Sequence, residues 1–129
     1  MAKLMNLDRI WTAPEGVSIT VGNNRTITRD TRADGAQVFI CRLHGVPVVV
    51  ATPHGTGGTV TIRLDSCGYL TTTTIAAMRD FMRAFGVAGS ASRAGGVLSA
   101  RWYQDGWKER ESSDGESMGF AADRNPVPA

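Results

Sequence analysis

The sequence predicts an α+β protein in which a curled antiparallel sheet of about five to seven short strands packs on one main helix. Residues 60–65 alternate apolar and polar side chains, which is the period of a half-buried strand. Ile75, Met78, Met82 and Phe85 recur three or four positions apart and form one apolar stripe of a helix over about 74–86. Most other apolar runs are short and end in glycine or polar turns, as strands do.

Four threonines stand directly before the helical stripe, at residues 71–74. A threonine hydroxyl can accept a hydrogen bond from a free N–H group in the first turn of a helix, so this run predicts the N-cap. Gly86 follows the stripe and predicts the end of the helix.

Further strands are predicted on both sides of this unit, at residues 16–21, 25–29, 36–43, 46–50 and 97–103, with a short last strand beginning at Trp107. Gly22-Asn23-Asn24 and Asp105-Gly106 are turn signals between neighbouring strands. Pro47 has no N–H group for a ladder, so its strand is expected to lie at a sheet edge or to begin there. The small, polar residues 87–96 predict a mobile connection.

One domain is predicted over residues 1–111, which hold the whole expected core: Val38, Ile40, Val48, Val50, Val60, Ile62, Leu64, Ile75, Met78, Met82, Phe85, Leu98 and Trp102. Residues 112–129 offer little to pack except Met118 and Phe120. We predict a flexible C-terminal tail there.

Composition favours an ordinary globular protein, with 129 residues, 42% of them hydrophobic and 20% charged. Its longest apolar runs stay below the roughly 18 residues that span a bilayer, and polar residues interrupt the N-terminal segment where a signal peptide would be apolar. Cys41 and Cys67 make no disulfide framework. We expect a cytoplasmic location without membrane contact. The net charge of +2 divides into +4 for residues 1–111 and −2 for residues 112–129, and a charge of +4 is too weak a signal to indicate nucleic-acid binding.

Two groups of residues are candidates for binding. Arg79 and Arg83 are four apart on the helix, beside the apolar stripe. Aromatic and basic residues alternate around the last two strands, a pattern that can stack bases or anchor a protein interface. The predicted binding residues are Arg63, Thr73, Thr74, Arg79, Arg83, Arg101, Tyr103, Trp107 and Lys108.

Catalytic and metal motifs are missing from the pattern. Cys41 and His44 would lie on opposite faces of a regular strand, and neither HExxH nor paired CxxC spacing occurs. We therefore predict no catalytic residue, metal or cofactor, and a bystander thiol at Cys67. The alternative is a phosphate or carboxylate site at the N-terminus of the helix, using the threonines at 71–74 with His44 or His54.

Residues 43–82 resemble a family of small phage and prophage accessory proteins. The matching segments read LHGVPVV at 43–49, IRLDSCGY at 62–69, TTTT at 71–74 and AMR at 77–79. They are similar to the family's hGTpVV, LnSGGW, TvTT and RMN patterns. Cys67 replaces a glycine, Tyr69 a tryptophan, and the early basic residue of the helix is absent, which weakens a phosphate-binding role. The resemblance implies a phage setting and no catalytic residues.

The sequence thus predicts a phage-encoded accessory protein that acts in the host cytoplasm by binding a host or phage macromolecule. The specific hypothesis is an inhibitor of a bacterial defence complex, possible targets including CRISPR–Cas nucleoproteins. One alternative is a nucleic-acid-binding module, and the other is a small nucleotide-binding protein or enzyme that uses the threonine run. An oligomer that pairs through an edge strand near Pro47 stays open.

Overall fold

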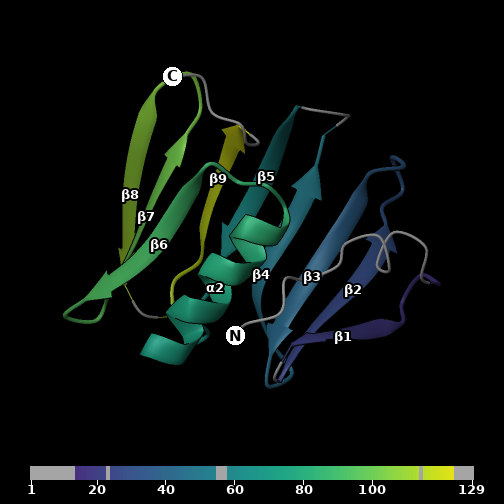
Figure 1. Cartoon of the computed structure of the whole chain (residues 1–129), viewed down its shortest axis with the longest axis horizontal. Helices are drawn as coiled ribbons and strands as arrows, with labels where there is room; N and C mark the ends of the chain where they lie inside the picture. The colour runs from purple at the N-terminus through teal and green to yellow at the C-terminus, as the bar shows by residue number, and fades with distance from the viewer. Residues whose placement is uncertain (1–13, 23, 55–57, 114, 124–129) are drawn as a thin grey trace.

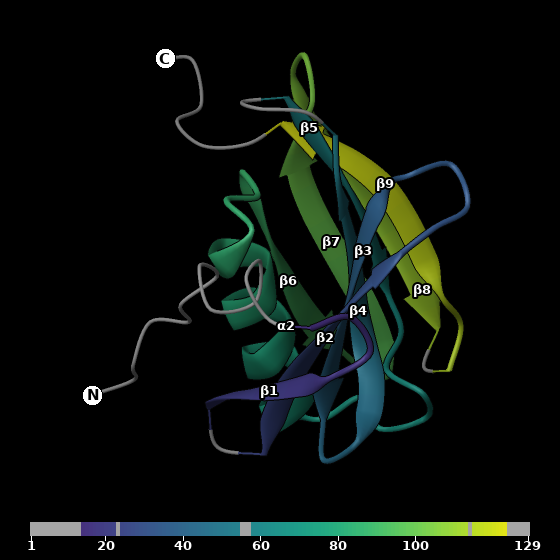
Figure 2. The ribbon, with the colours of Figure 1, turned by 90° about the vertical axis from the view of Figure 1, so that its right-hand side faces the viewer.

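The computed structural model describes residues 14–22, 24–54, 58–113 and 115–123. Within them nine strands form two antiparallel sheets, and one helix lies against their inner faces (Figures 1 and 2). The predicted combination of one main helix with antiparallel strands is confirmed, but the strands are more numerous than predicted.

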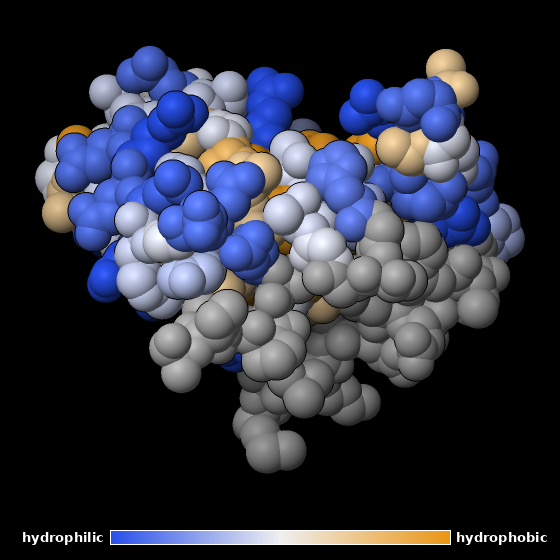
Figure 3. Space-filling view, turned by 90° about the horizontal axis from the view of Figure 1, so that it is seen from above, coloured by the Kyte–Doolittle hydropathy of each residue, from blue (hydrophilic) through white to orange (hydrophobic). Residues whose placement is uncertain are grey.

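The larger sheet has the order β1-β2-β3-β4-β5-β9. Its strands are β1 (Ser18–Gly22), β2 (Arg25–Thr31), β3 (Gln37–Leu43), β4 (Val46–Pro53), β5 (Thr59–Leu64) and β9 (Met118–Asp123). The smaller sheet has the order β6-β7-β8, with β6 (Gly89–Ala94), β7 (Val97–Tyr103) and β8 (Trp107–Ser113). Helix α2 (Thr72–Ala84) connects β5 to β6. Seen from above, hydrophobic side chains show between the hydrophilic groups that cover the two sides of the molecule (Figure 3).

Two local features of the sequence determine where α2 begins and which of its faces is buried: the threonine cap and the apolar stripe. The Thr71 hydroxyl accepts a hydrogen bond from the Thr74 N–H at 3.2 Å, as the threonine run predicts. The apolar stripe, including Met78 and Met82, is buried. The helix ends at Ala84, slightly earlier than predicted, and Gly86 then adopts a left-handed φ of 73° that suits glycine.

The inward faces of β3 and β4 differ from the prediction. Val38, Ile40 and Val50 are only half-buried on the back of the larger sheet, whereas Phe39 and Val49 pack inward. A nearly continuous apolar run does not indicate which of its faces is covered. The other predicted core residues are buried.

The strand with Pro47 is not at an edge, because β4 lies between β3 and β5. The sheet accepts the proline at a bulge, where Cys41 pairs with Val49 but Arg42 pairs with Pro47. A bulge is one of the few interior positions at which the missing N–H group is tolerated. The prediction of an edge strand near Pro47 is therefore wrong, whereas the alternative, a strand that begins at this point, agrees with the start of β4 at Val46.

The predicted mobile connection is also wrong for residues 89–94, which form β6. Small residues are needed here because the strand lies close to its neighbour. A Cβ atom at Gly89 would stand 2.3 Å from the Arg101 carbonyl oxygen, and Ala91 is buried.

The predicted tail is wrong for residues 112–113 and 118–123, which lie in strands. Residues 112 and 113 end β8, and β9 pairs with β5 as the last strand of the larger sheet. Met118, Phe120 and Ala122 alternate inward and are buried. The Phe120 ring stacks on Trp102 of β7 with 4.2 Å between centroids, so the core uses residues beyond 111. Residues 114 and 124–129 lie outside the described part of the chain.

Phe120→Ala tests the role of β9. Truncating this buried ring should lower the free energy of unfolding by about 3–5 kcal/mol in urea titrations followed by circular dichroism. Ser117→Ala, an exposed position just before the strand, should change it by less than about 0.5 kcal/mol. Equal effects of the two substitutions would show that the segment does not belong to the core.

Candidate functional site

The side of the smaller sheet that faces away from the core carries three of the nine residues predicted for binding, Arg101, Tyr103 and Trp107. Leu98, Ala100 and Trp102 of β7 are buried, so the alternate residues of that strand point outward. Residues opposite each other in a ladder share a face, and the register places Ser90 and Glu109 beside Arg101. We call this surface the β6–β8 face; it consists of Ser90, Ser92, Ser99, Arg101, Tyr103, Trp107, Glu109 and Glu111.

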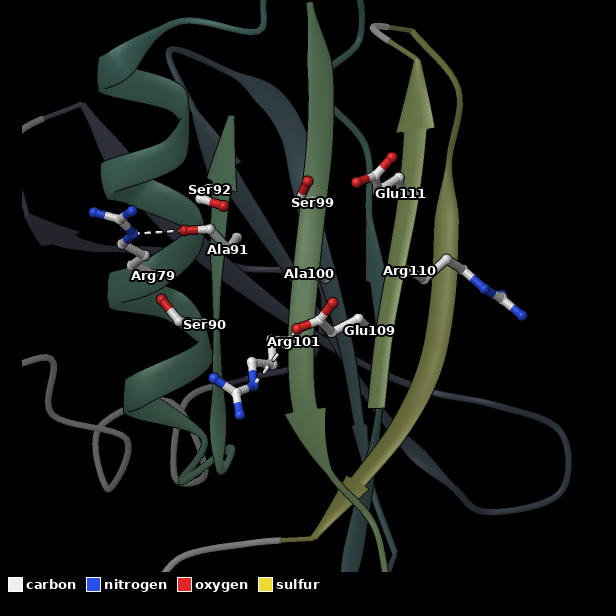
Figure 4. Close-up of a pocket in the computed structure, with 10 residues that line it drawn as sticks. All are labelled: Arg79, Ser90, Ala91, Ser92, Ser99, Ala100, Arg101, Glu109, Arg110 and Glu111. Atoms are coloured by element: carbon white, nitrogen blue, oxygen red, sulfur yellow. Dashed lines mark hydrogen bonds and ion pairs between the residues drawn. The ribbon is translucent and has the colours of Figure 1, made fainter. Parts of the chain in front are cut away.

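A hollow of about 300 Å³ lies on the β6–β8 face. Serines form its floor, and Arg79 and Arg101 approach it from α2 and β7 (Figure 4). The Nε of Arg79 donates a hydrogen bond to the Ala91 carbonyl of β6 at 2.6 Å. The structure therefore brings together two of the predicted arginines, although one of them is already tied to the edge of β6.

An exposed aromatic cluster stands at one end of this face. Trp107 is 53% exposed, and the Arg101 guanidinium carbon lies 4.7 Å from the centroid of its ring. Tyr103 meets the same ring edge to face, with 5.5 Å between centroids. Such cation–π contacts contribute about 0.5–1 kcal/mol at exposed sites, so the indole is held in place while its surface stays open.

The remaining predicted basic residues lie elsewhere. Arg63 pairs with Val50 and Gly119 on the back of the larger sheet. Lys108 is opposite Trp102, on the other face of β8. Arg83 is exposed on α2, 3.9 Å from Asp80. A nucleic-acid-binding module would use the five basic residues of the predicted set, which thus do not form one continuous surface: Arg63, Arg79, Arg83, Arg101 and Lys108.

Thr73 and Thr74 line a separate cavity of about 470 Å³, beside the first turn of α2. His44 reaches this cavity, whereas the His54 ring makes a 2.7 Å hydrogen bond with Thr61 on β5. The wall contributed by β3 and β4 is apolar, and the described residues that line the cavity include no lysine or arginine: Leu43, His44, Val46, Val48, Ser66, Tyr69, Thr71, Thr73 and Thr74. A phosphate would find the helix N-terminus and the His44 imidazole as partners, without a lysine or arginine among the described lining residues.

The two thiols are not activated. Burial raises the pKa of Cys41 well above its usual range. The pKa of Cys67 is also raised, first by partial burial and then by the neighbouring Asp65 carboxylate. Both shifts keep the sulfur protonated at neutral pH, so neither thiol has the character of a nucleophile.

Within the described residues, no three His, Cys, Asp or Glu side chains are grouped as metal ligands would be. Among these same residues, α2 is too short and too polar to cross a membrane. Comparisons of the chain with protein-family models, with curated proteins and with solved structures give no match.

Sequence reasoning missed the ion pair between Arg25 of β2 and Asp80 of α2. No local signal predicts it, because the two residues are 55 positions apart. The pair ties α2 to β2, the second strand of the larger sheet. Asp80 therefore has a structural role beside the predicted Arg79 and Arg83.

Thiol labelling tests the environment of the two cysteines. With excess Ellman's reagent, the native protein should react at one thiol per chain, that of half-buried Cys67, and release one equivalent of thionitrobenzoate. The second thiol, that of buried Cys41, should react only after unfolding. Because the pKa of Cys67 is raised, its reaction at pH 7 should be slower than that of free cysteine and should accelerate as the pH rises. A faster reaction than free cysteine at neutral pH would show an activated thiolate.

Proposed function

We propose that this protein acts by binding another protein through the β6–β8 face. The observation that carries the proposal is the exposed Trp107 ring, held between Arg101 and Tyr103. Tryptophan, tyrosine and arginine are the residue types that contribute most to binding energy at protein interfaces.

The strands under this cluster support the proposal because they are fixed by burial on their other side. Leu98, Ala100 and Trp102 anchor β7 in the core, so Arg101 and Tyr103 project from a rigid backbone. Side chains that are already ordered lose little conformational entropy when a partner binds.

The charges of the face favour a protein over nucleic acid as the partner. Glu109 and Glu111 stand with Arg79 and Arg101 around the same hollow, and Arg110, which also lines it, points its side chain away (Figure 4). A site for a polyanion needs an excess of positive charge, because its affinity comes largely from the release of counterions. Mixed charges around an aromatic cluster are instead usual in protein interfaces.

The biological setting of the proposal comes from the resemblance of residues 43–82 to phage accessory proteins. We propose a host protein as the partner and, as the specific candidate, a component of a defence complex such as a CRISPR–Cas nucleoprotein. A direct nucleic-acid contact is the alternative, and salt dependence separates the two.

The test is capture from a bacterial lysate with the full chain as bait. Trp107→Ala and Arg101→Ala should each weaken retention of a specific protein by about thirtyfold or more, as truncation of an interface hot spot does. Arg63→Ala is the matched control, since it removes an exposed arginine from the back of the larger sheet.

Capture that survives nuclease treatment and 0.5 M salt supports a protein partner. Capture that disappears with nuclease or falls steeply with salt supports the nucleic-acid alternative. If Arg63→Ala weakens retention as much as Trp107→Ala does, the β6–β8 face is not the binding surface.

A further inference from the structure

The two sheets meet at a seam where their hydrogen-bonded ladders stop. In the described residues, β8 pairs only with β7 and β9 pairs only with β5, although β8 and β9 follow each other in the chain. Arg110 of β8 crosses the seam, and its Nη1 donates a hydrogen bond to the Gly119 carbonyl of β9 at 3.0 Å. The edge of β8 that points away from β7 therefore has backbone groups available for pairing.

The seam also contains a cavity of about 410 Å³, formed by residues at the end of β8 and the start of β9. Ser112 lines it, and the Oγ atom of that serine is buried without a hydrogen-bond partner among the described residues. An unsatisfied buried hydroxyl costs free energy unless another group supplies the missing bond.

The charges on β8 are sorted by face. Glu109 and Glu111 lie on the β6–β8 face, opposite Arg101 and Ser99. Lys108 and Arg110 lie on the other face, and Figure 4 shows Arg110 pointing away from the two glutamates. Neither Lys108 nor Glu111 forms an ion pair with a described residue.

We propose that an extended segment of a partner protein adds to the free edge of β8 as an antiparallel strand. The segment carries acidic residues opposite Lys108 and Arg110 and basic residues opposite Glu109 and Glu111. This inference rests on the proposed function, in that the partner is a protein bound at the smaller sheet. Backbone hydrogen bonds give such a complex its affinity, and opposed side chains select the segment.

Charge and symmetry exclude a second copy of this chain as the added strand. A two-fold axis between antiparallel copies of β8 runs perpendicular to the sheet and leaves each side chain on its own face. Opposed residues must share a face, so no register of such a pair places Lys108 or Arg110 of one copy opposite a glutamate of the other. Like charges directly opposite each other destabilise a strand pair.

The test is a titration of the full ¹⁵N-labelled chain, followed by amide NMR shifts, with two blocked hexapeptides of equal composition. Thr-Lys-Glu-Lys-Glu-Val matches the four charges of β8 in antiparallel register. Thr-Lys-Lys-Glu-Glu-Val opposes two of them with like charge. The first peptide should shift the amides of β8 and bind at least about fivefold more tightly than the second, because of its cross-strand charge pairs.

Glu109→Lys with Glu111→Lys, made in one chain, should abolish the preference and keep the fold, since both glutamates are exposed. Equal affinities of the two peptides, no shift in β8, or a dimer formed through β8 by the chain alone would overturn the inference. If the peptides fail while capture still depends on Trp107 and Arg101, only the strand addition is wrong. If capture fails as well, the proposed function is wrong.

Discussion

The packing of α2 against the inner faces of both sheets is the interaction on which the rest of the structure depends. In the part of the chain that the structure describes, one helix covers a curved layer of nine strands, and Met78, Phe81 and Met82 are among its buried residues. Phe85 continues this stripe, with its ring centroid 5.0 Å from that of Phe39 on β3. The ion pair between Arg25 of β2 and Asp80 also holds the helix to the larger sheet. Because the helix occupies the inside of the curve, the binding that we propose uses an outward-facing surface.

The stacking of Trp102 on Phe120 has a similar consequence for the smaller sheet. It joins β7 to β9 across the core and orients β7 so that Arg101 and Tyr103 face outward. The edge of β6 is occupied by α2 through Arg79, whereas β8 exposes charged side chains on both of its faces. Edge strands that carry many charges resist uncontrolled pairing, and the same charges can select a complementary strand.

Much of α2 and the exposed aromatic cluster around Trp107 could be predicted from the sequence, because both depend on residues that are close together in the chain. Helical spacing and the Thr71 cap are local signals, and a short turn brings Trp107 back beside Tyr103. The inward face of β3 could not be predicted, because its apolar run has no alternation. The sequence predicts a tail in place of β9, because the few apolar residues of this strand are buried only through contacts with distant residues, those of β5 and Trp102. The sequence also groups Lys108 and Arg63 with Arg101 and Trp107, but the strand register places Lys108 on the other face of β8 and Arg63 on the larger sheet.

Native-state hydrogen exchange tests most directly whether β9 closes the core and leaves β8 as the open edge. The amides of β9 that bond to β5 should exchange as slowly as those of β5 itself, through global unfolding. Amides on the outer edge of β8 should exchange orders of magnitude faster in the absence of a partner. Rapid exchange throughout β9, at the rate of an unfolded chain, would contradict the account.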